Sequence, residues 1–392
     1  MSAYSLSPNQ IRLLRLRAQH LAPRLAVGGT ASAIIGALVS ELGGVQAQEA
    51  PAAALAICVR SLGLGVADIE RARVVDRSVV RLWAMRNTLH LVAAADLGWL
   101  LPLLGPTFIA GSRRRYAQLG LDEATCANGV RAIRELLAAH GPLTRAELVA
   151  RLASDYHLRL EGQMTPHLIA RAALDGYLCL GPDRGAKPTY ALLDDWLGGA
   201  GWRDHTLPRD EAATELARRH LGAYAPATPE DFAAWSGLPM SEARAAWRRL
   251  GDQLIEVEAD GRPMWMLATQ AEWLDDALAG TMRPVWETPL VRLLPAYDAS
   301  LLGYRKRDLL VAPEHAKRVN AGGGIIHPTL SVDGRIVGTW KQTRRRDGGV
   351  EIVATPFETL AEEALTGLAE EVAAVGGFLE APVLWHTKFF EA

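Results

Sequence analysis

One order of predicted elements occurs three times in the first 282 residues: three helices followed by a pair of short strands. The second copy is the clearest, with helices predicted over residues 123–139 and 165–175 and strands over 177–180 and 189–192. Gly141 marks a turn, and Thr144 with Glu147 three positions later forms a capping box that begins the middle helix. Three helices and a hairpin predict a winged helix-turn-helix module.

The other two copies follow the same plan. In the third, Thr228 and Pro229 begin the middle helix, and Asp260-Gly261 is a hairpin turn. The third copy predicts helices over residues 209–220, from 228 onward and over 241–250, and strands over 254–257 and 264–267. The first copy is stretched, with helices over 7–20, 30–42 and 51–62 and a hairpin within 83–92.

The pattern changes after residue 283. Strands are predicted over 291–295, 324–330, 335–341 and 350–355, and a helix with an acidic face over 356–374. The fold class expected is α+β and mainly helical, with three tandem winged helix-turn-helix modules and a β-rich C-terminal domain. The predicted boundaries are 1–120, 121–200 and 201–282 for the modules and 283–392 for the C-terminal α+β domain.

Composition restricts the class of protein. The chain has 392 residues, 49% hydrophobic and 22% charged, which is ordinary for a globular protein. Its three cysteines are far apart and lack neighbouring ligands, so we expect no disulfide framework, no metal and a reducing, cytoplasmic location. The N-terminal 25 residues contain no signal-like apolar run, and Asp96, Pro102 and Pro106 interrupt the apolar segment 91–111. That segment predicts a buried helix followed by a bend, and no membrane span.

Basic residues are distributed unevenly although the net charge is −2. Arg73, Arg77 and Arg81 recur every four residues, which would place them on one helix face. A second cluster is Arg113, Arg114 and Arg115, and a third is Lys341, Arg344, Arg345 and Arg346. A single basic cluster is usually a solvated face. Three clusters in separate parts of the chain are as typical of contacts with DNA phosphates as of solvated faces.

Two glutamines, Gln46 and Gln48, lie just before Pro51 and an alanine-rich helix. On spacing alone they are more typical of a solvated helix start than of a catalytic site. Glu49 beside them favours the first turn of a helix, where the helix dipole stabilises a carboxylate. The pair gains interest from the basic segments and from modules of a kind that binds DNA.

Several ordered motifs resemble the AlkZ/YcaQ-type DNA glycosylases, in the branch with a Gln-x-Gln motif. They are Gly44–Gln48 with Pro51 and Arg60, Met85–Leu91, Leu294–Asp298 with Gly303-Tyr304, and His327–Trp340. The resemblance runs from about residue 8 to about residue 385. It implies tandem winged helices, a β-rich C-terminal part, and excision of alkylated purines, including bulky or crosslinked N7-alkylguanines.

The resemblance also implies roles for individual residues. Gln46 and Gln48 are carried over as the catalytic pair. A hairpin of the C-terminal part is expected to contact DNA, and Lys341 with Arg344–Arg346 are assigned to it. Arg86 is expected to clamp a phosphate. His90 is expected either to contact DNA or to be a buried structural histidine. The expected partner is double-stranded DNA with alkylated purines, bound by a monomer without a cofactor.

The chemistry of such a reaction is compatible with glutamines. N7 alkylation gives the base a positive charge, so the base departs as a neutral species without being protonated. An amide can position water and hold a sugar or phosphate oxygen, although its lack of a useful pKa makes it a poor general base. No lysine lies near the motif in sequence, so we expect a monofunctional glycosylase without a Schiff-base lyase step.

Two other functions remain open at this stage. A non-catalytic winged-helix regulator would bind a specific operator independently of lesions, and a protein-interaction scaffold would show no salt-dependent DNA binding. A serine hydrolase, a P-loop enzyme and a metalloenzyme are disfavoured because their motifs are missing from the sequence. The sequence does not distinguish a methyl adduct, a bulky adduct and a crosslink as the physiological lesion.

Overall fold

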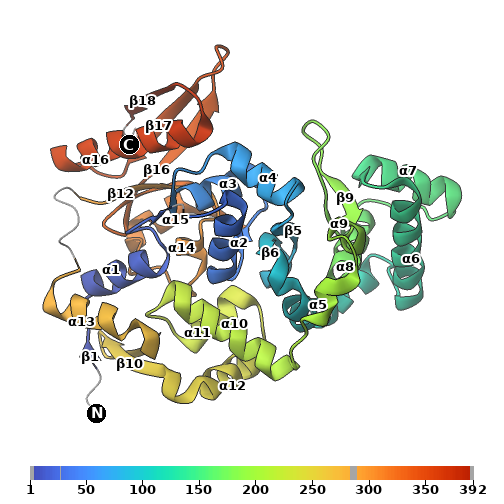
Figure 1. Cartoon of the computed structure of the whole chain (residues 1–392), viewed down its shortest axis with the longest axis horizontal. Coiled ribbons are helices and arrows are strands. Elements are labelled where there is room, and N and C mark those ends of the chain that lie inside the picture. The colour runs from blue at the N-terminus through green and yellow to red at the C-terminus, as the bar shows by residue number, and fades with distance from the viewer. Residues whose placement is uncertain (1–3, 27, 283–288, 389–392) are drawn as a thin grey trace.

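The computed structural model describes residues 4–26, 28–282 and 289–388. The predicted domain boundary between residues 282 and 283 therefore lies at the edge of a segment, 283–288, outside the described residues. The elements fall into four consecutive blocks (Figure 1). In the view of Figure 1 the second block forms a lobe at the right, the third lies at the bottom, and the C-terminal block lies at the top left.

The first block supplies the centre of the molecule. Its helices are α1 (Pro8–Ala18), α2 (Ala31–Glu41), α3 (Ala50–Cys58), α4 (Val66–Val74) and α5 (Leu97–Gln118), with η1 (Met85–Asn87) and η2 (Ala94–Asp96). Its strands are β1 (Tyr4–Ser5), β2 (Leu25–Ala26), β3 (Val45–Gln46), β4 (Ser61–Leu62), β5 (Val79–Trp83) and β6 (Leu89–Ala93). The predicted hairpin is present as β5 and β6, which pair in an antiparallel register.

The second block has the element order predicted for it. It comprises α6 (Glu123–His140), β7 (Leu143–Thr144), α7 (Arg145–Asp155), α8 (Met164–Leu174), β8 (Leu178–Leu180), β9 (Thr189–Leu192), α9 (Leu193–Trp196) and η3 (Ala200–Asp204). The Thr144 and Glu147 capping box is present at the start of α7, as predicted. The strands of this block join those of the first in one six-stranded sheet, ordered β3-β6-β5-β8-β9-β7. The two blocks are therefore continuous through β5 and β8.

The third block also repeats the plan. It comprises α10 (Arg209–Tyr224), α11 (Pro229–Ser236), α12 (Met240–Leu250), η4 (Gly251–Gln253), β10 (Leu254–Ala259), β11 (Arg262–Leu267), η5 (Ala268–Gln270) and α13 (Ala271–Ala279). Thr228 caps α11 through Asp231, and Asp260 and Gly261 take positive φ at the hairpin turn, as predicted. The N-terminal segment of the first block also packs here, since β1 pairs with β10 and α1 contacts α10 and α13.

The C-terminal block is built on a five-stranded sheet ordered β12-β15-β16-β17-β18. Its elements are β12 (Val291–Leu294), α14 (Ala299–Leu302), η6 (Pro313–His315), α15 (Ala316–Val319), β13 (Asn320–Gly322), β14 (Ile325–Ile326), β15 (Thr329–Val332), β16 (Arg335–Arg344), β17 (Val350–Pro356), α16 (Glu362–Leu379) and β18 (Val383–Thr387). The last helix begins later than predicted because Pro356 ends β17. Strands β16 and β17 form a long hairpin that projects from the body (Figure 1).

Helix α5 departs from the prediction of a helix followed by a bend. It is continuous through Pro102 and Pro106. Gly105 lets it approach α8 closely, since a Cβ there would lie 2.2 Å from the carbonyl oxygen of Leu174. Residues 94–118 are long and apolar enough to cross a membrane by length and composition, but 56% of the most apolar window is buried inside the protein. Packing against α8 and α10 makes it a core helix.

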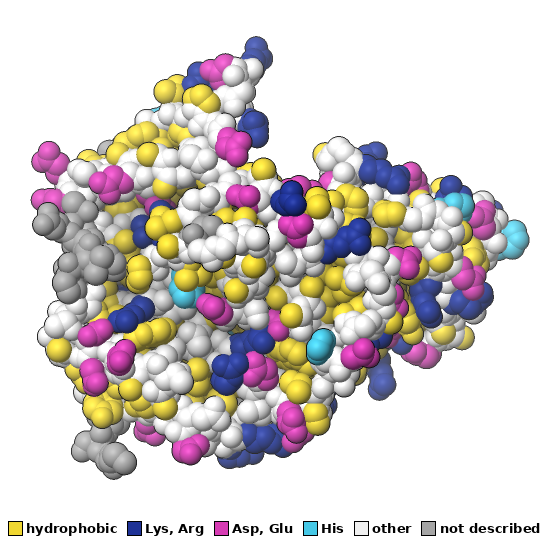
Figure 2. Space-filling view, in the orientation of Figure 1, with side chains coloured by type: hydrophobic (Ala, Val, Ile, Leu, Met, Phe, Trp, Pro, Cys, Tyr) yellow, Lys and Arg dark blue, Asp and Glu magenta, His cyan; other side chains and the backbone are white. Residues whose placement is uncertain are grey.

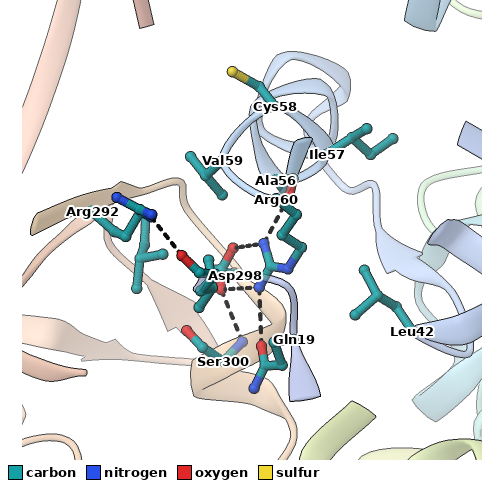
Figure 3. A network of polar contacts seen from close by, with 12 residues as sticks. Gln19, Leu42, Ala56, Ile57, Cys58, Val59, Arg60, Arg292, Asp298 and Ser300 are labelled. Carbon is teal, nitrogen blue, oxygen red and sulfur yellow. Dashed lines mark hydrogen bonds and ion pairs between the residues drawn. The ribbon is translucent and has the colours of Figure 1, made fainter. Parts of the chain in front are cut away.

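Buried ion pairs join the first block to the C-terminal block (Figure 3). Arg60 donates two 2.8 Å hydrogen bonds to the carboxylate of Asp298, both side chains are fully buried, and Gln19 accepts a third bond from Arg60. Burial opposes ionisation of Asp298, but the charge of Arg60 and the hydrogen bonds from Arg60 and Ser300 together outweigh it and keep the pKa of Asp298 below its ordinary value. Arg24 pairs with Glu371 of α16 at 2.5 Å. Replacing one residue of either ion pair would leave a buried charge unpaired. The ion pairs therefore fix the orientation of the C-terminal block relative to the first block.

Candidate active site and DNA-binding cleft

The two glutamines of the motif lie at the edge of the six-stranded sheet. Gln46 ends β3, where it pairs with His90 of β6, and Gln48 follows in a bend before α3. Burial alternates along this segment: Val45 and Ala47 are buried, Gln46 is half-buried and Gln48 is exposed. Extended backbone places alternate side chains on one side. Ala47 is therefore held within the protein, Gln46 is partly covered, and Gln48 is the glutamine of the motif that reaches the surface.

Two arginines, Arg81 and Arg86, donate hydrogen bonds to the motif. Arg81 of β5 donates to the backbone carbonyls of Ala47 at 2.9 Å and Gln48 at 3.2 Å. Arg86 donates from Nη2 to Oε1 of Gln46 at 2.7 Å and from Nη1 to the carbonyl of Trp235 at 2.6 Å. Burial lowers the pKa of Arg86 to about 10, so it stays charged at neutral pH. The guanidinium groups fix the backbone and one side chain of the motif.

His90 is a structural residue at this site. Its side chain is buried, and Nδ1 lies 2.9 Å from the carbonyl oxygen of Thr88. Burial, with a smaller contribution from the charge of Arg86, lowers the pKa of His90 to about 3. The imidazole is therefore neutral at physiological pH. Of the two roles expected for His90, its burial favours the structural one.

A cleft of about 820 Å³ lies beside the motif. Its floor is α3 and α4, one wall is the loop between β8 and β9, and the other is the β16–β17 hairpin. In Figure 2 the surface is hollowed between the projecting C-terminal hairpin and the lobe of the second block. Lining residues from the motif, the loop and the hairpin are Ala47 and Gln48, Asp183 and Gly185, and Gln342 and Arg344. Gln48 is thus the motif side chain that faces this space directly.

The hairpin carries the third predicted basic cluster, which we call the hairpin group: Lys341, Arg344, Arg345 and Arg346. Lys341, Arg344 and Arg346 are exposed, and Arg345 pairs with Asp347 at the hairpin turn at 2.6 Å. Arg344 lines the cleft. The group places exposed positive charge on a cleft wall, as a phosphate contact requires.

Four other predicted DNA contacts have guanidinium groups bonded within the protein and form what we call the inner group: Arg73, Arg77, Arg81 and Arg86. Arg73, in α4, is buried against Glu70, Asp183 and the carbonyl of Gly181. Arg77 follows α4 with positive φ and donates to the carbonyl of Trp196 at 2.5 Å.

The prediction that Arg73, Arg77 and Arg81 share a helix face is wrong, because α4 ends at Val74 and Arg81 lies on β5. Direct contact of these arginines and of Arg86 with DNA stays a prediction, and Arg73 and Arg81 line the cleft. Each guanidinium meets acceptors inside the protein: Arg73 holds the β8–β9 loop against α4, and Arg81 and Arg86 hold the motif.

Comparison with known proteins decides the family. The family described as DNA glycosylase AlkZ-like matches residues 39–378. The chain belongs to the AlkZ-like DNA glycosylases. A curated relative, the interstrand DNA cross-link repair glycosylase of Streptomyces sahachiroi, is 34% identical over 95% of this chain and 98% of its own length. The solved structure of the Streptomyces sahachiroi DNA glycosylase AlkZ matches with a TM-score of 0.78 and 30% identity, covering 97% of this chain and all of that one.

Membership of the AlkZ-like family makes DNA the substrate and disfavours the regulator and scaffold alternatives. The resemblance inferred from the sequence motifs is confirmed. Among the described residues, no group of three His, Cys, Asp or Glu side chains is arranged to hold a metal ion. The three cysteines are buried, and burial raises the pKa of Cys58 to about 12, so its thiol is a poor nucleophile.

Sequence reasoning missed three partners that shape the site. The carbonyl of Trp235 holds Arg86, Asp183 holds Arg73, and Asp298 holds Arg60. The first is a backbone group and has no sequence signal. Asp298 and Arg60 both belong to motifs of the family resemblance. Of the three partners, Asp298 is therefore the one that the sequence could have indicated.

Proposed function

We propose that this glycosylase hydrolyses the N-glycosidic bond of cationic N7-alkylated purines in duplex DNA, including bulky or crosslinked adducts. The observation that carries the proposal is the exposed Gln48 side chain on the floor of a cleft of about 820 Å³. Small and aliphatic residues, including Ala50, Pro51 and Val66, surround it. Such a floor leaves room for a substituent on the base.

The reaction needs few catalytic groups. The C1′–N9 bond breaks, its electron pair neutralises the charge of the alkylated base, and water attacks the oxocarbenium-like sugar. Positioning of that water by Gln46 and Gln48 can contribute several kcal/mol, with about 1.4 kcal/mol for each tenfold in rate. No lysine lines the cleft among the described residues, which agrees with hydrolysis without a Schiff base.

DNA would enter between the two walls. We propose that the second and third blocks are winged-helix modules, with the β8–β9 loop as the wing on one side of the duplex. The hairpin group binds phosphates from the other side. The cross-link repair function in the name of the Streptomyces sahachiroi relative supports a lesion of this size for this chain.

The test is release of 7-methylguanine from methylated duplex DNA without added metal, by wild type and by Gln46→Ala and Gln48→Ala. The matched control is Gln253→Ala, an exposed glutamine of η4 in the third block. We expect release by wild type and the control, and a loss of at least about 100-fold in both motif variants with DNA binding retained. Absence of release by wild type from both methylated and bulky-adduct DNA would overturn the proposal.

A further inference from the structure

The two glutamines of the motif differ in what their amides are free to do. Oε1 of Gln46 accepts a 2.7 Å hydrogen bond from Nη2 of Arg86. A guanidinium has donors and no acceptor, so the group facing it must be the carbonyl, which fixes the orientation of the amide. Nε2 of Gln46 makes no hydrogen bond to any of the described residues. The donor end of this side chain is therefore the end left for a ligand.

Arg86 is itself held in one position. Its second hydrogen bond goes to the carbonyl of Trp235 in the last turn of α11, the negative end of that helix dipole. Gly237, in the left-handed conformation that ends α11, packs on the Arg86 backbone, where a Cβ would lie 3.1 Å from its N and Cα atoms. Arg86 adopts positive φ and, within residues 4–26, 28–282 and 289–388, makes no ion pair with a carboxylate. Its polar contacts are the two carbonyls that fix its geometry.

Gln48 has no such restraint. Its backbone carbonyl accepts from Arg81, but its side chain is exposed and bonded to no residue in the described part of the chain. Its amide can turn either end to the cleft. A motif of two identical residues is thus asymmetric: a cation orients the amide of Gln46, and no described residue orients the amide of Gln48.

We propose that Arg86 is a positioning residue that makes Gln46 a dedicated donor and leaves Gln48 as the acceptor for the attacking water. This inference rests on the proposed function and deepens it. Gln46 Nε2 donates to a sugar or phosphate oxygen of the lesion nucleotide. Gln48 Oε1 accepts a hydrogen bond from the water, whose oxygen bonds to C1′ as the C1′–N9 bond breaks. The electron pair of that bond goes to the base, and the extra proton of the added water passes to solvent.

A double-mutant cycle separates this role from a merely structural one. Arg86→Met and Gln46→Ala are made singly and together, and single-turnover release of 7-methylguanine is measured with saturating enzyme. If Arg86 acts through Gln46, Arg86→Met lowers the rate at least about tenfold in the wild type and less than about twofold in the Gln46→Ala background. Equal losses in both backgrounds would show that Arg86 supports the fold or another group, and would overturn the inference.

A second pair of variants does not depend on tolerance of Arg86→Met. Gln46→Glu replaces the donor by an acceptor that pairs with Arg86, whereas Gln48→Glu keeps an acceptor. We expect Gln48→Glu to be at least about tenfold more active at pH 8 than Gln46→Glu, and to lose rate as acid protonates its carboxylate. Equal rates, or the reverse order, would contradict the assignment. Failure of wild type to release the base is a different result, because it overturns the proposed function itself.

Discussion

The inner group and the hairpin group contain four basic residues each, yet the first is bonded within the protein and the second is largely exposed. Arg73 and Arg81 are 4% and 8% exposed, and their guanidinium groups are bonded to carbonyls and carboxylates inside the protein. Arg344 and Arg346 are exposed at the end of a projecting hairpin. The comparison teaches that basic residues grouped in the sequence can be bonded within the fold in one place and exposed in another, which spacing alone does not show. The inner group instead builds the site to which the outer group would bring DNA.

The largest effect is expected at Arg81. Arg81→Ala leaves the carbonyls of Ala47 and Gln48 without their donor, so the motif segment can shift. Displacement by about 1 Å costs about 100-fold in rate. We expect excision of 7-methylguanine to fall by about that factor while DNA affinity changes little, as measured by single-turnover kinetics and a filter-binding titration. Loss of DNA affinity with an unchanged excision rate would instead show that Arg81 contacts DNA directly.

Arg73 should matter for stability. Arg73→Met leaves Asp183 and the Gly181 carbonyl unpaired beside α4, and we expect the free energy of unfolding to fall by about 2–3 kcal/mol. The control is Arg71→Met on the same helix, whose side chain is 64% exposed and pairs with Asp76 at the surface. That variant should lose no more than about 1 kcal/mol. Urea unfolding of both variants measures the difference. Equal losses of unfolding free energy would show that burial does not make Arg73 more important for stability than the exposed Arg71.

The hairpin group should act through salt-dependent affinity. Arg344→Gln with Arg346→Gln removes two exposed charges, and the slope of log K against log salt should become shallower by about 2. The control is Arg131→Gln on α6, 59% exposed and paired with Glu135. Affinity measured across a salt series gives the slopes. A double variant with the wild-type slope would show that the hairpin does not contact phosphates.

The smallest effect concerns pH. Burial lowers the pKa of His90 to about 3, from the ordinary 6.5, so the unfolded chain takes up a proton below about pH 6.5 that the folded chain does not. Its contribution to stability is complete above pH 6.5 and is lost as the pH falls. Burial does the same at His220, where the pKa is about 4.

Each histidine adds up to about 1.4 kcal/mol per pH unit to the slope of unfolding free energy. Urea unfolding of wild type and His90→Gln between pH 7 and pH 5 measures it. The free energy of unfolding of the variant should depend less steeply on pH than that of wild type. An unchanged pH dependence would show that His90 is exposed to solvent, as the hairpin group is.

Local signals predicted much of the fold. The capping residues Thr144 and Thr228 and the turn at Asp260-Gly261 act within a few residues, and each of these elements is where the sequence places it. What sequence could not provide depends on long-range contacts. The pairing of Arg60 with Asp298 spans 238 residues, and the sheet that joins the first two blocks depends on β5 meeting β8.

The candidate site divides in the same way. The Gln46 and Gln48 motif was found through its resemblance to a family, and the position of Gln48 on the floor of a cleft could not be predicted from spacing. The contacts of Arg81 with Ala47 and of Arg86 with Trp235 had no sequence signal, because the acceptors are backbone carbonyls that every residue carries. Arginine spacing alone therefore predicted the wrong surface.

The central claim is that the positive charge of the alkylated base drives its departure, with glutamines supplying only position. The most direct measurement compares duplexes that contain 7-methylguanine or 7-methyl-7-deazaguanine, which has nearly the same shape but no charge. We predict similar binding of the two duplexes and release of the charged base alone. Release of the neutral base at a comparable rate would contradict the account, since the enzyme would then have to activate the leaving group itself.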